Sequence, residues 1–139
     1  MKNILNSKLI LLIPAYWACF FDVIITIVHQ SDDYWKGNLE KANEGNPIGA
    51  FFMSYHTSGL FIISIIWLIA IGIIGFYLKE RMLKIFALFV LIAHTFGAST
   101  WLSFNYSFWF AIVFILLNSI LYIEIDRIYE TRKKMPIIV

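Results

Sequence analysis

Charged residues are scarce in this chain: they make up 14% of its 139 residues, whereas apolar residues make up 60%. A soluble domain of this length could not enclose so much apolar surface in one core. The composition therefore excludes an ordinary water-soluble fold and indicates that lipid is the solvent for most of the chain. The net charge is only +2 and no basic surface suited to nucleic acid is evident, so nucleic acid is excluded as a partner.

The chain also lacks the residues and motifs of several familiar sites. Its single cysteine, Cys19, cannot form an internal disulfide. It has no H-E-x-x-H zinc motif, no G-x-S-x-G nucleophile turn and no two histidines four residues apart. The sequence therefore indicates no particular reaction, and whether the chain is an enzyme stays open.

What the chain has instead is four long apolar stretches. A membrane-spanning helix needs about 20 apolar residues, because the hydrocarbon layer is roughly 30 Å thick and a helix rises about 1.5 Å per residue. The stretches lie at about residues 9–29, 48–78, 84–102 and 107–126. The first lacks a small-x-small cleavage site, so we expect a retained helix and not a signal peptide. The pattern predicts one all-α domain, residues 1–139, with four transmembrane helices in an up-down bundle.

The positions of lysine and arginine predict the orientation of this bundle, since these residues are retained on the cytoplasmic side. Nine of the eleven precede the first stretch, join the second to the third, or follow the fourth. Only Lys36 and Lys41 lie in the loop between the first two stretches. We therefore expect both chain ends on the cytoplasmic side of a plasma or inner membrane, with an organellar inner membrane as the alternative.

Several polar residues lie inside the predicted spans, where an ionisable group costs about 2.5 to 3.5 kcal/mol. Asp22 shares one face of the first helix with Thr26 and His29, at spacings of four and seven residues. The third helix carries His94 and, five residues later, Ser99. Counted from the outer helix ends, Asp22 and His94 both lie roughly 15 Å deep, so the two side chains are expected to meet.

One hypothesis for these residues is a metal site between the first three helices. Asp22, His56 and His94 would be the ligands, with His29 or Glu44 as an outer ligand or base. Imidazole and carboxylate suit zinc or another divalent transition metal, and three protein ligands leave a position for water. Such a water could act as the nucleophile of a metal-dependent hydrolase.

Other hypotheses use the same residues differently. Asp22 can hydrogen-bond Thr26, Ser99 or a protonated His94 and simply lock the helices together. With water between them, the same groups can form a proton or ion pathway. A haem held by His56 and His94 is a further, weaker alternative.

The loop before the second stretch ends in Glu44-Gly45-Asn46-Pro47, where Gly45 and Asn46 suit a turn and Pro47 suits a helix start. Together with Asp22-x3-Thr26, this pattern resembles a group of small uncharacterised prokaryotic membrane proteins with a D-x3-T and E-x-N-P pattern. The resemblance covers roughly residues 18–60. It implies that Asp22, Thr26, Glu44, Asn46 and Pro47 form one unit in which the turn folds over the first helix, and it supplies no reaction.

Two functional classes follow from these observations. In the first, which we favour, the chain is an accessory or scaffold subunit of a membrane complex, with other subunits or further copies of itself as partners. In the second, a polar pocket near the outer face binds a metal ion or a small polar headgroup and hydrolyses a substrate. The substrate, the oligomeric state and the source are not accessible from the sequence.

Overall fold

The computed structural model describes residues 2–134, with side chains described from residue 8 to residue 133. Within that range the chain is helical and has no strand. Its elements are α1 (Lys2–His29), α2 (Asp32–Trp35), the 3-10 helix η1 (Leu39–Lys41), α3 (Pro47–Met53), α4 (Gly59–Tyr77), α5 (Glu80–Asn105) and α6 (Phe108–Lys134). Four of them, α1, α4, α5 and α6, are long and apolar enough to cross a membrane. The all-α fold class and the number of long apolar helices are as predicted.

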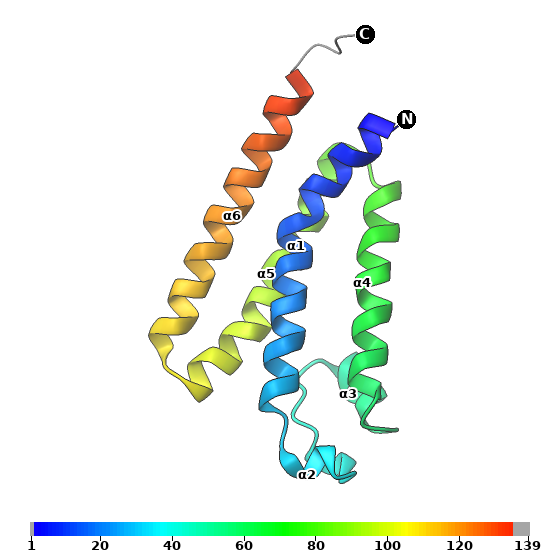
Figure 1. Cartoon of the computed structure of the whole chain (residues 1–139), viewed down its shortest axis with the longest axis vertical. Helices are drawn as coiled ribbons and strands as arrows, with labels where there is room; N and C mark the ends of the chain where they lie inside the picture. The colour runs from blue at the N-terminus through cyan, green and yellow to red at the C-terminus, as the bar shows by residue number, and fades with distance from the viewer. Residues whose placement is uncertain (1, 135–139) are drawn as a thin grey trace.

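The four long helices run alternately in opposite directions, and the start of α1 lies at the same end of the bundle as the end of α6 (Figure 1). Helix α1 is central because it packs against α5, α6 and α4, whereas α4 has few contacts with α5 although the two are consecutive. At the end near the chain termini, Lys8 Nζ donates hydrogen bonds to the carbonyl oxygens of Phe76 and Leu78, at 2.6 and 2.9 Å. Lys8 thereby ties the beginning of α1 to the end of α4.

The second predicted span, 48–78, is wrong as a single helix, because the structure divides it into α3 and α4. The break falls at the polar residues 54–58, whose side chains bond locally: Ser54 donates to the Phe51 carbonyl and His56 Nδ1 accepts from the Ser58 backbone N–H. Such local bonds offer the backbone an alternative to the helix ladder. The other helices extend beyond the predicted limits, α6 by eight residues to Lys134 against a predicted end at 126.

Glycines allow α1 and its neighbours to approach closely. A Cβ added at Gly75 of α4 would lie 2.6 Å from a methyl carbon of Leu12, and one added at Gly72 would lie 2.6 Å from the Tyr16 hydroxyl oxygen. At the start of α4, a Cβ at Gly59 would lie 2.0 Å from the backbone oxygen of Phe52. Gly59, Gly72 and Gly75 thus allow helices of this chain to pack closely against one another.

The loop between α1 and α4 is held by side chains that bond to its backbone. The buried side chain of Gln30 both accepts from the Asn43 N–H at 2.9 Å and donates to the Asn43 carbonyl at 2.6 Å. Tyr34, which is fully buried, donates its hydroxyl to the Thr57 carbonyl at 3.1 Å. These bonds fold the loop over one end of the bundle, where it includes α2, η1 and α3 (Figure 1).

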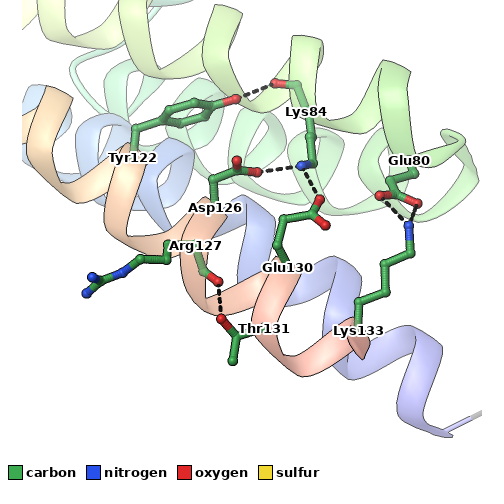
Figure 2. A network of polar contacts seen from close by, with 8 residues as sticks. All are labelled: Glu80, Lys84, Tyr122, Asp126, Arg127, Glu130, Thr131 and Lys133. Atoms are coloured by element: carbon green, nitrogen blue, oxygen red, sulfur yellow. Dashed lines mark hydrogen bonds and ion pairs between the residues drawn. The ribbon is translucent and has the colours of Figure 1, made fainter. Parts of the chain in front are cut away.

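At the opposite end, ion pairs join α5 to α6 (Figure 2). Lys84 Nζ lies 2.6 Å from a carboxylate oxygen of Asp126 and 2.6 Å from one of Glu130. One turn away, Lys133 contacts both carboxylate oxygens of Glu80, at 2.8 and 2.7 Å. Lys84 and Lys133 are therefore paired with acidic residues of the same chain.

Candidate functional site

The structure brings Asp22 of α1 and His94 of α5 into contact. Their closest atoms, Asp22 Oδ2 and His94 Nδ1, are 2.8 Å apart, a hydrogen-bond distance. Both side chains are largely removed from the surface, with 20% of Asp22 and 18% of His94 exposed. The predicted contact between these two side chains is therefore present.

Trp67 of α4 extends this pair into a chain of three side chains. Its indole Nε1–H donates to His94 Nε2 at 2.7 Å. An indole N–H can only donate, so Nε2 must carry a lone pair and the ring proton must lie on Nδ1, where it donates to Asp22. The geometry therefore indicates a neutral His94 beside an Asp22 carboxylate, and not the protonated His94 that the sequence offered as one possibility. Three helices, α1, α4 and α5, are joined by these two hydrogen bonds.

The three side chains lie between apolar layers. On the side near the chain termini are buried residues including Cys19 and Val90, and on the other side are Ile25 and Ala98. Gly97 makes room for the carboxylate, because a Cβ at that position would lie 2.8 Å from Asp22 Oδ1. Apolar surroundings strengthen a hydrogen bond and make an unpaired charge costly, so this cluster favours a single arrangement of the helices.

The Glu44–Pro47 turn lies near this cluster. Glu44 Oε1 accepts from the Asn46 N–H at 2.7 Å, and the Glu44 side chain packs against Gly49 of α3. Asn46 caps α3 by accepting from the Ile48 N–H at 3.0 Å, with Pro47 as the first helical residue. Burial raises the pKa of Glu44, the hydrogen bond from the Asn46 N–H lowers it, and the negative charge of Asp22 raises it. The residue before this turn, Asn43, is bonded to Gln30, so the turn begins beside the end of α1.

The other residues predicted for this site are not joined to it. His29 lies on the same face of α1 but stacks on Trp101, with ring centroids 6.0 Å apart, and meets the edge of Tyr106. Thr26 and Ser99 are buried, and no side-chain hydrogen bond to Asp22 is formed by either within the described part of the chain. Thr26 and Ser99 therefore do not complete the Asp22 site as expected.

His56 is placed differently from the expectation. It lies exposed in the connection between α3 and α4, with Nδ1 2.9 Å from Ser58 Oγ. His56 lies before the start of α4. Trp67, which contacts His94, is eight residues into α4, about 12 Å along the helix axis, so His56 and His94 lie at different levels of the bundle. Within residues 8–133, no group of three or more His, Cys, Asp or Glu side chains is arranged to hold a metal ion. The predicted metal set of Asp22, His56 and His94 is thus not supported, and the ring nitrogens of His94 are both engaged in hydrogen bonds.

Two contributors to the buried polar structure, Trp67 and Gln30, escaped the sequence-based prediction. Trp67 was counted only as an apolar residue of the second span, although its N–H is a donor that needs a partner in lipid. Gln30, one residue beyond α1, gave no signal other than its position at a helix end. Asn118 of α6 joins two helices by donating to Thr95 of α5 at 3.1 Å. Its neighbour Ser119 instead bonds the Ile115 carbonyl of its own helix.

Comparison of the chain with protein-family models, with curated proteins and with solved structures finds no match. The resemblance to small prokaryotic membrane proteins stays a prediction.

Proposed function

We propose that this chain is a multi-pass membrane protein whose two ends lie on the cytoplasmic side, and that it serves as an accessory or scaffold subunit of a membrane complex. Its four apolar helices support the membrane location. The orientation is supported by the cations, which gather at the end of the bundle where α1 starts and α6 ends. The loop with Lys36 and Lys41 would then face the outside of a plasma or inner membrane.

The observation that carries the accessory role is the use of the polar side chains inside the bundle. His94 has one ring nitrogen bonded to Asp22 and the other to Trp67, so the three side chains act as a connection between helices. Gln30 and Tyr34 likewise hold the outer loop, and Asn118 joins α6 to α5. These side chains are engaged in contacts that align parts of the chain, which favours a structural role for them over a catalytic one.

The orientation is tested by labelling single cysteines in a Cys19→Ala background. Ser54 and Thr131 are both exposed, and they lie near opposite ends of the bundle. We expect a membrane-impermeant maleimide added to intact cells to label Ser54→Cys at once, and Thr131→Cys only after the membrane is opened. Labelling of Thr131→Cys in intact cells would overturn the proposed orientation.

The accessory role is tested by mild detergent extraction of the tagged chain from the membrane in which it is naturally made. We expect a defined assembly that contains the chain and other membrane subunits in fixed stoichiometry. The conservative variants Asp22→Asn and His94→Gln should leave that stoichiometry unchanged, because both side chains face the interior of the bundle. Recovery of the natural chain only as a single copy in lipid and detergent would contradict the proposal.

A further inference from the structure

The last turns of α6 have two different faces. Asp126, Glu130 and Lys133 point toward α5, where they pair with Lys84 and Glu80 (Figure 2). At 100° per residue, positions 127, 128, 131 and 132 fall on the opposite side of the helix. A shallow open depression on that side is lined by Arg127, Ile128, Thr131 and Arg132. The outer face of this helix end therefore combines two guanidinium groups with an apolar side chain.

From this face we infer a site for the headgroup of an anionic phospholipid, in which Arg127 and Arg132 bind the phosphate while the acyl chains lie along the apolar surface of α6. The inference rests on the proposed membrane location. Arginine suits phosphate because its planar fork of N–H donors matches two phosphate oxygens. The hydroxyl of Thr131 is not counted as a donor, since it already donates to the Arg127 carbonyl at 2.9 Å.

The depth of these residues agrees with that assignment. The predicted hydrocarbon span of α6 ends near residue 126, and the headgroup layer adds about 5 to 7 Å on each side of the hydrocarbon. Arg127 lies at the start of this layer, and Arg132 is five residues further, about 7.5 Å along the helix. Toward the membrane interior, α6 presents exposed Ile120 and Ile123, which would contact acyl chains.

One acidic residue also lies on this face and limits its charge. Glu124 forms an ion pair with Arg127, whose side chain is 72% exposed. The pair uses one nitrogen of the Arg127 guanidinium, which has five N–H donors, and Arg132 has no ion-pair partner within the described part of the chain. The face is therefore left with a surplus of one positive charge, and removal of Glu124 should strengthen the site.

The test uses the full-length chain in detergent, titrated with phosphatidylglycerol or phosphatidylcholine, with bound lipid measured by native mass spectrometry. We expect a preference for phosphatidylglycerol that falls about fivefold per arginine in Arg127→Gln/Arg132→Gln. Glu124→Gln should increase the preference. The matched control is Lys79→Gln/Arg81→Gln, which removes two exposed cations at the same end of the bundle but outside the depression.

Three outcomes would overturn the site. An equal loss in the control variant would show a diffuse attraction to all cations at this end. No gain in Glu124→Gln, which keeps every cation, would show that the depression does not bind the headgroup. Competition by inorganic phosphate at the same concentration as the lipid would assign the depression to a free anion. All three outcomes are independent of whether the chain has partner subunits, so failure here is distinguishable from failure of the accessory role.

Discussion

Substitution of His94 by leucine is expected to lower the free energy of unfolding by about 3 kcal/mol. Leucine fills a similar space but leaves the Asp22 carboxylate without its partner in an apolar layer. The Trp67 N–H also loses its acceptor, which lies 2.7 Å away in the native chain. Reversible unfolding in mixed micelles, followed by tryptophan fluorescence, measures the loss.

Two further variants separate the charge from the hydrogen bonds. Asp22→Asn removes the charge, so the double variant Asp22→Asn/His94→Leu should recover about half of the lost stability. Trp67→Phe removes the indole N–H together with the five-membered ring and should cost at least about 1 kcal/mol. If the double variant were no more stable than His94→Leu, the unpaired carboxylate would not be the source of the loss.

Substitution of Gly59 by alanine is expected to cost about 2 to 3 kcal/mol, although it adds only one methyl group. The added Cβ would lie 2.0 Å from the Phe52 oxygen and 2.5 Å from its carbonyl carbon. Both are backbone atoms, so no side-chain rotation relieves the contact, and α3 must move away from α4. The same unfolding measurement detects the change.

Gly45→Ala is the matched control for this substitution. Gly45 lies in the same outer loop region, but a Cβ added there meets no atom within 4 Å. We expect its effect to stay within about 0.5 kcal/mol. Equal stability of the two alanine variants would show that the close approach of α3 to the start of α4 does not matter for folding.

The sequence was sufficient to predict four long apolar helices and the contact between Asp22 and His94, because both follow from constants of the α-helix. Apolar length sets the number of spans, and the fixed rise per residue sets the depth of a side chain below the helix end. A shared depth and a shared chemical need for a partner were enough to place these two residues together.

The remaining features depend on how each helix is rotated about its own axis and on where a helix is interrupted. The length of an apolar stretch determines neither. Trp67 contacts His94 because α4 is turned about its axis in one particular way, and a strongly apolar helix has no polar face from which to read that rotation. The prediction of His56 as a ligand inside the bundle assumed one continuous helix over 48–78. Ser54 and Ser58 form local bonds that end this helix, and His56 is thereby placed in a turn.

The central position of α1 has a consequence for biosynthesis. Since the chain is made from its N-terminus, α1 leaves the ribosome before α4, α5 and α6, and each of these three packs against it. Each of them therefore meets a docking surface that has already been synthesised. Assembly can proceed one helix at a time, without waiting for the C-terminal half to be translated.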